Sequence, residues 1–353
     1  MVVYLDLVKS NIARAIDLAD GDVSKLRPHV KTHKTAEIIA MELDAGLTKH
    51  KCATLREAEM IAEAGATDVL IAYQMVGPNV DRLVTLKRNF PGVDFKVIVD
   101  HPDGVEMLSQ AMAKNSMKMK IMLDLDAGMH RTGIAPGAPA ADLYAQIDRA
   151  DGLVPWGIHV YDGHIHDEHL EDRRRSCNQS LILVADLKDR LATKGLDVPL
   201  VVMGGTPTFP IYAKTPGVEA SPGTFIFYDL NYSNRYPNLG FTHAALLLTR
   251  IISIPTANLI AVDLGHKAIA ADSKGDRGKI LSIEGAEVGL QNEEHWVVKI
   301  PKGTDIKLGQ EIYVCPTHVC PSVALQKSYY IIDRDGNCID TWQVAARNRD
   351  LDA

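Results

Sequence analysis

The feature that most constrains the fold is a regular alternation of two kinds of segment over the first two-thirds of this 353-residue chain. Short runs rich in Val, Ile and Leu alternate with longer segments whose apolar residues recur every three or four positions. A helix-like segment follows each of the first seven strand-like runs. The eight expected strands are residues 26–33, 51–54, 68–73, 95–99, 120–125, 154–160, 200–203 and 217–220.

Strict alternation of strands and helices predicts a parallel sheet. Eight such units within about 200 residues fit a closed (β/α)8 TIM-like barrel. An open doubly wound sheet is the alternative. It would need a glycine-rich phosphate turn after its first strand, and residues 28–34 contain no glycine.

The pattern changes after about residue 236. Apolar, β-branched runs are separated there by turn signals, without a convincing long helix. These runs are residues 244–254, 259–264, 296–300, 311–314 and 329–332. We therefore predict a barrel over 8–235 and a C-terminal all-β domain over 236–353, with residues 1–7 forming a strand that joins the β domain.

Composition excludes several classes of function. The chain is 46% hydrophobic, its formal net charge is −7, and it lacks a long basic tract, which argues against a nucleic-acid partner. No apolar run approaches the roughly 20 residues of a membrane span. Five scattered cysteines, an odd number, indicate reduced thiols and a cytoplasmic location rather than a disulfide framework.

Lys31 is the first candidate for chemistry, because active sites of such barrels lie at the carboxyl ends of the strands. It ends the first expected strand, in the run R-P-H-V-K-T-H-K (residues 27–34). Strand alternation places Lys31 on one face with His29 and His33. A lysine in this position suits Schiff-base chemistry. The alternative is the solvated basic end of a strand.

Polar residues follow the other expected strands at the same end. Glycines and hydroxyls after strands seven and eight, where such barrels commonly bind phosphate, predict an anion cradle. A lysine opposite this cradle suggests pyridoxal 5′-phosphate. Candidates for contacting this cofactor are Gln74, Arg131, Tyr161, Gly205, Thr206, Ser221, Gly223 and Thr224. Arg131 and Tyr161 could instead be ordinary rim residues.

Two further motifs carry imidazoles. His164 and His166 follow strand six and are candidate general bases or ligands. His318 and Cys320 alternate, so on an extended chain both side chains point the same way. An imidazole and a thiolate suit Zn²⁺, and two ligands leave positions for water or substrate, as in a catalytic site. The alternative is a turn with buried cysteines.

Taken together, five motifs resemble one known family. They are R-P-H-V-K-T-H-K, K-C-A-T-L-R-E-A-E, D-L-D-A-G-M-H-R-T-G, G-G-T-P-T and P-T-H-V-C-P-S-V-A-L. The chain resembles the D-threonine aldolase and D-serine dehydratase group. These are fold-type III pyridoxal phosphate enzymes with an alanine-racemase-like barrel and a C-terminal β domain.

The resemblance implies roles for these residues. Lys31 would be the Schiff-base lysine, and Arg131 and Tyr161 would line the cofactor. The phosphate would lie against Gly205, Thr206 and the turn 221–224. His318 and Cys320 would hold a divalent metal, Zn²⁺, Mn²⁺ or Mg²⁺. The resemblance also implies a homodimer and a small amino-acid substrate.

The function expected is a metal-assisted lyase of β-hydroxy-D-amino acids, with D-threonine aldolase favoured. The first alternative is a dehydratase of D-serine or 3-hydroxy-D-aspartate. Cys320 supports it, since D-threonine aldolases of this group carry an acidic second ligand. An amino-acid racemase is the next alternative, and it would not need His318 and Cys320. A non-catalytic pyridoxal phosphate carrier is disfavoured, because small carriers of this fold lack a β domain.

Overall fold

The computed structural model describes residues 1–350 and contains two compact units. Unit 1 comprises Met1–Arg14, Thr32–Thr35 and Thr224–Arg347, and unit 2 is built mainly from Ala15–Lys31 and Ala36–Gly223. Helix α1 (Leu5–Leu18) belongs partly to each. The boundaries predicted from the sequence, 8–235 and 236–353, stay predictions, and residues 351–353 of the predicted β domain lie outside the described part.

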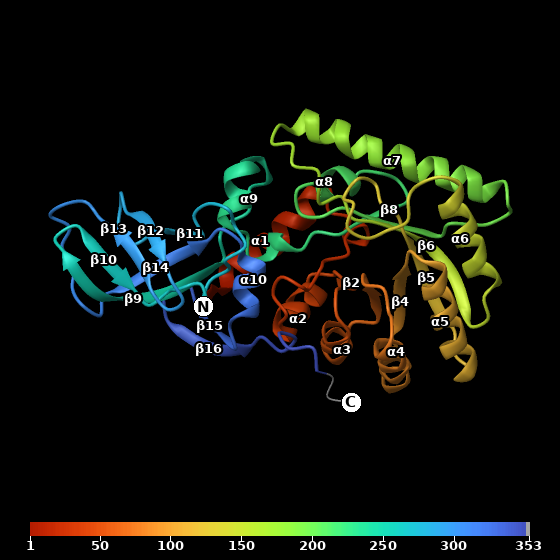
Figure 1. Cartoon of the computed structure of the whole chain (residues 1–353), viewed down its shortest axis with the longest axis horizontal. Helices are drawn as coiled ribbons and strands as arrows, with labels where there is room; N and C mark the ends of the chain where they lie inside the picture. The colour runs from red at the N-terminus through yellow and green to blue at the C-terminus, as the bar shows by residue number, and fades with distance from the viewer. Residues whose placement is uncertain (351–353) are drawn as a thin grey trace. The chain divides into compact units, whose positions relative to one another are not determined.

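Unit 2 is a parallel α/β structure (Figure 1). Its seven strands pair in chain order, as predicted from the alternation. They are β2 (Lys49–Cys52), β3 (Asp68–Ile71), β4 (Asp94–Val99), β5 (Met119–Asp124), β6 (Leu153–Val160), β7 (Leu200–Met203) and β8 (Val218–Ala220). The connecting helices are α2 (Ala36–Asp44), α3 (Leu55–Glu63), α4 (Pro78–Asn89), α5 (Pro102–Lys114), α6 (Ala138–Arg149), α7 (Leu170–Ala192) and α8 (Phe209–Tyr212). The TIM-like fold class expected from the sequence is confirmed.

The first predicted strand, residues 26–33, is wrong. This segment makes only isolated bridges, from Leu26 to Ala220 of β8 and from His29 to Lys51 of β2. Pro28 has no N–H to extend a ladder, and residues 30–33 form a turn in which His29 Nδ1 accepts the Lys31 N–H at 3.3 Å. The sheet therefore has seven regular strands. An irregular segment takes the eighth position, between β8 and β2.

The amino ends of the strands carry a network of buried and partly buried ion pairs, which we call the ionic floor. Arg27 is fully buried and donates to Asp68 at 2.6 Å and to Glu219 at 2.8 Å. Lys96 bonds Asp68 and Asp94, both at 2.8 Å. The remaining members are Lys49, which pairs with Glu219, and Lys120, which pairs with Asp94. Every cation of the floor thus faces at least one carboxylate.

Above the floor the strands bury an apolar layer made of Leu70, Ile98, Met122 and Val202. Strand pairing extends this inner face toward the carboxyl ends. Lys51 is in register with Leu70, and His159 is in register with both Asp124 and Val202. Because side chains alternate along a strand, these three polar residues face the same interior. The carboxyl end of the sheet is therefore polar inside as well as at its rim.

Helix α3 begins where its sequence predicts. Thr54 is the N-cap, and its hydroxyl accepts the Glu57 N–H at 3.1 Å. The Glu57 carboxylate reaches back and accepts the Ala53 N–H at 2.6 Å. This reciprocal capping arrangement fixes the chain at the carboxyl end of β2, one residue after Cys52.

Unit 1 is mostly antiparallel β structure. Its strands are β1 (Val2–Tyr4), β9 (Ala245–Thr256), β10 (Leu259–Val262), β11 (Gly278–Ile280), β12 (Glu287–Gln291), β13 (Trp296–Lys299), β14 (Glu311–Pro316), β15 (Ser328–Ile332) and β16 (Cys338–Gln343). β1 lies between β9 and β15, parallel to β15. Two short helices complete the unit, α9 (Leu230–Arg235) and α10 (Val319–Ala324). The expected C-terminal β domain is confirmed as a fold class.

Within residues 1–350, no helix combines the length and the apolar character needed to cross a bilayer.

Candidate functional site

Tyr161, directly after β6, is the centre of the first group of predicted site residues. The Lys31 Nζ lies 5.5 Å from the centroid of its ring, and the Arg131 guanidinium carbon lies 4.8 Å from it. A methyl group at Gly163 would come within 2.4 Å of the ring, so a larger residue there would displace Tyr161. Gly205 faces the same ring, at 3.5 Å from an ideal Cβ. We call these five residues the Tyr161 cluster.

The turns after β7 and β8 are tied to one another. Thr206 Oγ1 accepts the Gly223 N–H at 3.1 Å, and Ser221 Oγ donates to the Arg27 carbonyl at 2.9 Å. Asp162, buried next to Tyr161, accepts a hydrogen bond from Thr208. The turns predicted to bind phosphate are therefore held together at the carboxyl end of the sheet. Their role as a cradle remains a prediction.

The other candidates at this end differ in their surroundings. Gln74 Oε1 accepts the Asp100 N–H at 2.8 Å, and its amide packs against Gly104, which indicates a structural role. His164 packs against Gly128, and its buried Nδ1 has no hydrogen-bond partner among the described residues. His166 is exposed. Of the two imidazoles, His164 has the environment of a reactive group.

Three interior residues were missed by the sequence interpretation. Asp124 and His159 form a buried pair, with Oδ1 and Nδ1 2.7 Å apart, and the His159 Nε2 has no hydrogen-bond partner in the described chain. Lys51 is buried at 2% exposure. Each of the three is a charged or polar residue inside an expected strand, and this pattern could have identified them. It was available in the motifs K-C-A-T and D-L-D and in the sequence around β6.

The protonation of these groups follows from burial. Burial lowers the pKa of His159, and this outweighs the opposing effect of Asp124. Burial is also the main reason that the pKa of Lys51 is lowered to about 7, with the charge of Lys31 acting in the same direction. Burial raises the pKa of Asp162. The interior of unit 2 therefore holds several groups whose pKa values are shifted by burial, as active sites do.

The residues present fit pyridoxal 5′-phosphate. Lys31 offers an amine beside an aromatic ring and a guanidinium. Buried nitrogens without partners, His159 Nε2 and His164 Nδ1, are available to polar atoms of a bound group. When bound, this cofactor accepts electrons released at the α-carbon of an amino acid.

The second group of predicted site residues lies in unit 1, at the start of α10. Here the expectation of an extended chain at His318 and Cys320 is wrong, because His318 is the N-cap of α10 and Cys320 is inside the helix. The two side chains nevertheless interact, because Cys320 helps to raise the pKa of His318. Val319 N–H bonds the buried carboxylate of Asp229 at 3.1 Å, which holds the helix start in place. Capping, and not strand alternation, brings the pair together.

Asp272 is a further member of this group that the sequence did not reveal. Its Oδ2 lies 2.5 Å from His318 Nδ1. Burial lowers the pKa of His318, but Cys320 and Asp272 outweigh it and raise this pKa to about 9. The Cys320 sulfur lies 3.2 Å from Thr32 Oγ1 and 3.6 Å from Thr224 Oγ1, so Thr224 contacts the predicted metal ligand.

The donors fit a borderline metal ion. A thiolate and an imidazole suit Zn²⁺ better than Mn²⁺ or Mg²⁺, and a carboxylate on the second nitrogen of a ligating histidine is a common support. No group of three or more metal-binding side chains occurs in the described residues. The pair would therefore leave coordination positions for water or substrate.

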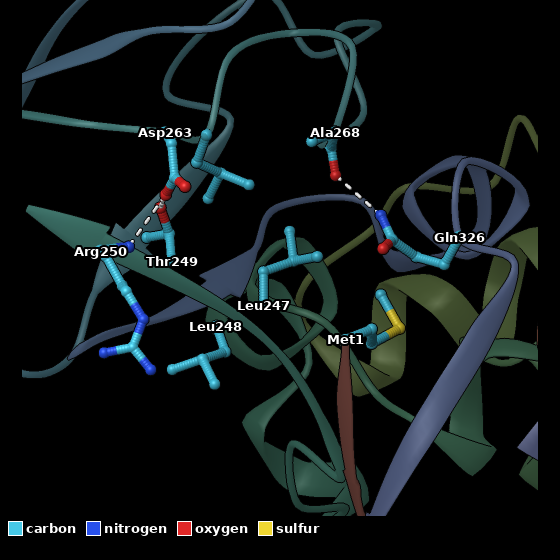
Figure 2. A pocket seen from close by; sticks show the side chains of 9 residues that line it. Met1, Leu247, Leu248, Thr249, Arg250, Asp263, Ala268 and Gln326 are labelled. Atoms are coloured by element: carbon cyan, nitrogen blue, oxygen red, sulfur yellow. Dashed lines mark hydrogen bonds between the residues drawn. The ribbon is translucent and has the colours of Figure 1, made fainter. Parts of the chain in front are cut away.

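A separate hollow in unit 1 contains none of the predicted site residues (Figure 2). Thr249 and the Arg250 N–H bond the Asp263 carboxylate at 2.5 and 2.9 Å. Gln326 donates to the Ala268 carbonyl at 3.0 Å. Because these polar groups bind one another, the hollow offers little chemistry.

Comparison with known proteins links both units to the family expected from the motifs. The family model described as "Alanine racemase, N-terminal domain" matches residues 3–230, and the one described as "Putative serine dehydratase domain" matches residues 244–332. A D-threonine aldolase of Arthrobacter sp. is 28% identical over 353 residues, covering 98% of this chain and 92% of the relative. A D-threo-3-hydroxyaspartate dehydratase of Delftia sp. (strain HT23) is 27% identical, with 97% and 95% covered.

Solved structures agree with this relationship. The crystal structure of D-threonine aldolase from Filomicrobium marinum superposes with a TM-score of 0.91 at 26% identity, covering 98% of this chain and 94% of that one. The fold thus matches along nearly the whole chain. The first family model alone spans well over half of it, and the chain belongs to the alanine racemase N-terminal domain family, in the group that also carries the serine dehydratase domain.

Proposed function

We propose that this protein is a lyase dependent on pyridoxal 5′-phosphate and a divalent metal, acting on β-hydroxy-D-amino acids. D-threonine aldolase is the activity we favour. The relatives described above are an aldolase and a dehydratase, both lyases, which supports this class. The observation that carries the proposal is the contact between His318 and Cys320. A racemase, which acts only at the α-carbon, has no need of a metal-binding pair.

The residues of the chain have distinct tasks in this proposal. Lys31 holds the cofactor covalently, and Tyr161 and Arg131 orient it. Thr32, the next residue after Lys31, contacts Cys320. His318 and Cys320 would hold the metal, which would supply Lewis acidity toward the β-hydroxyl of the substrate.

His164 is the base we favour for removing the hydroxyl proton, and His166 is the alternative. In aldol cleavage the bond between the α- and β-carbons breaks. The β-carbon leaves as an aldehyde, and the α-carbon gains a proton to give glycine.

Dehydration is the second candidate, and Cys320 favours it. In this reaction Lys31 removes the α-proton and the β-hydroxyl leaves as water. Hydrolysis of the remaining enamine yields a 2-oxo acid and ammonia. The same residues serve both reactions, so the products decide between them.

The homodimer and the cytoplasmic location expected from the sequence also stay predictions.

Product analysis of the purified full-length protein tests the proposal. With D-threonine, D-serine and 3-hydroxy-D-aspartate as substrates, we expect glycine and an aldehyde, and no turnover of L-threonine. Ammonia and a 2-oxo acid would identify the dehydratase. Inversion of alanine that survives treatment with a chelator would contradict both.

Lys31→Ala tests the cofactor assignment. We expect it to lose the visible absorbance band of the covalently bound cofactor. Lys34→Ala is the matched control, because Lys34 lies three residues away and its amine donates to the Ala346 carbonyl in unit 1. A covalent band that persists in Lys31→Ala would show that another amine binds the cofactor.

A further inference from the structure

Lys51 is a buried amine inside unit 2 that neither the predicted site nor the ionic floor uses. Its register with Leu70 turns it toward the interior, while the neighbouring His50 points to the opposite face, with its Nε2 3.2 Å from Glu42 of α2. It precedes the last residue of β2, so it lies near the carboxyl end of the sheet. Only 2% of Lys51 is exposed.

The other lysines on these strands each have a carboxylate partner, which Lys51 lacks. Lys49, on the same strand, pairs with Glu219, and Lys96 and Lys120 also bond carboxylates. Lys51 has no ion pair and no side-chain hydrogen bond within the described residues. A buried ammonium without a counter-charge is unfavourable by several kcal/mol. The fold therefore keeps a cationic group here without pairing it directly with a carboxylate.

Lys51 is tied directly to the segment that carries Lys31. Its N–H donates to the Pro28 carbonyl at 2.7 Å, and its own carbonyl accepts the Val30 N–H at 2.9 Å. The partners of these two bonds, Pro28 and Val30, flank His29, which forms an isolated β-bridge with Lys51. Val30 is the residue directly before Lys31. A shift of Lys51 would thus be transmitted to the cofactor lysine.

We propose that Lys51 is the counter-charge for an anionic oxygen of the molecule bound in the Tyr161 cluster, a role that rests on the proposed function. The oxygen belongs either to the cofactor or to the carboxylate of the amino acid. The amine is neutral in part when the site is empty, and it takes up a proton when the anion arrives.

The charged groups around Lys51 are consistent with this role. Burial lowers the pKa of Lys51 to about 7, and the cations Lys31 and Arg27 add to the effect. Asp162 and Asp124 act in the opposite direction but do not outweigh it. Lys51 in turn helps to lower the pKa of His159. An anion bound in this group would raise the pKa of Lys51, and linkage then requires proton uptake on binding.

Calorimetry of the full chain measures this uptake directly. The apoprotein is titrated with pyridoxal 5′-phosphate in PIPES and in HEPES, which ionise with different enthalpies and carry no primary amine. At about pH 8, one unit above the pKa of about 7, ~90% of the Lys51 amines are neutral. We expect wild type to take up close to one proton more per site than Lys51→Met. A second titration of the loaded protein with D-alanine, which lacks a β-hydroxyl, shows whether the amino acid brings the anion instead.

Two variants make the experiment specific. Lys51→Met keeps the volume of the side chain, and Lys51→Leu is a second neutral replacement should the first fail to fold. Lys49→Met is the matched control on the same strand, and its proton uptake should equal that of wild type. Both Lys51 variants should also bind the cofactor or D-alanine roughly tenfold more weakly.

Equal proton uptake by wild type and a folded Lys51 variant, in both titrations, would overturn the inference. Failure of the wild-type protein to bind the cofactor covalently is a different result. It would contradict the proposed function, and the role of Lys51 would be lost with it.

Discussion

His318 has two ring nitrogens, and its contact with Asp272 leaves one of them for a metal. The carboxylate lies 2.5 Å from Nδ1, which favours a proton on that nitrogen and directs Nε2 to other partners. Such a carboxylate fixes the orientation of a ligating imidazole and increases its basicity. Asp272 is therefore a positioning residue for the proposed metal pair.

Asp272→Asn should weaken Zn²⁺ binding by about 10- to 100-fold, because it removes the charge that orients His318. Competition with a chromophoric chelator measures this affinity without an activity assay. Asp276→Asn, an exposed change of the same charge in the same loop, should bind as wild type does. Unchanged affinity in Asp272→Asn, with binding lost in His318→Ala, would show that the carboxylate has no such role.

Among the elements, α3 shows how a local motif fixes a site. The hydroxyl of Thr54 and the carboxylate of Glu57 satisfy two backbone N–H groups that the helix itself cannot. These bonds begin one residue after β2 ends, and β2 carries Lys51. The cap therefore fixes where the strand stops and the helix begins.

Thr54→Ala is expected to lower the free energy of unfolding by about 1 kcal/mol, the usual effect of losing an N-cap. Urea denaturation followed by circular dichroism measures it. Thr85→Ala is the control, since Thr85 is a half-buried residue within α4 whose hydroxyl donates to the carbonyl of Asp81. It should leave stability unchanged or raise it slightly. Equal stability of Thr54→Ala and wild type would show that other contacts set the start of α3.

Prediction of elements from the sequence succeeded where periodicity was strong. Strands β2 to β8 lie within a few residues of their expected positions, and a helix follows each of β2 to β7. It failed at residues 26–33, where alternation was present but Pro28 and a turn prevented a ladder. It also failed at His318, because spacing alone cannot distinguish an extended chain from a helix cap.

At the scale of the molecule, ion pairs rather than apolar side chains fill the amino end of unit 2, where the ionic floor lies. Burial alone would raise the pKa of Asp68, but Arg27 and Lys96 outweigh it and hold this pKa below its ordinary value. The sequence did not reveal this floor, since the pairing of Arg27 with Glu219 joins residues 192 positions apart. Long-range partners of this kind have no local pattern.

The floor makes stability depend on pH in a defined direction. The pKa of Asp68 is lower in the folded state, so the stabilisation it provides is fully present above about pH 4. It is lost as the pH falls through the folded-state pKa.

Arg27→Met leaves two partly buried carboxylates, Asp68 and Glu219, with fewer partners and should lower the free energy of unfolding at neutral pH by about 3 kcal/mol. The deficit should shrink in acid, where Asp68 becomes protonated. Urea denaturation across this pH range checks both points. Arg190→Met, which removes an exposed pair with Asp186 on α7, should change stability little. A folded Arg27→Met protein as stable as wild type at neutral pH would contradict this account.

The irregular segment between β8 and β2 also bears on the order of folding. Ser221 and Arg27, whose hydrogen bond helps to seat this segment, are 194 residues apart. Closing so long a loop is entropically unfavourable until the intervening strands have assembled. On a ribosome, Lys31 would emerge before β2 to β8, yet its surroundings could form only after β8 had been synthesised. The protein would then gain the ability to bind an aldehyde cofactor only at the end of folding, and cofactor binding would indicate that unit 2 is fully folded.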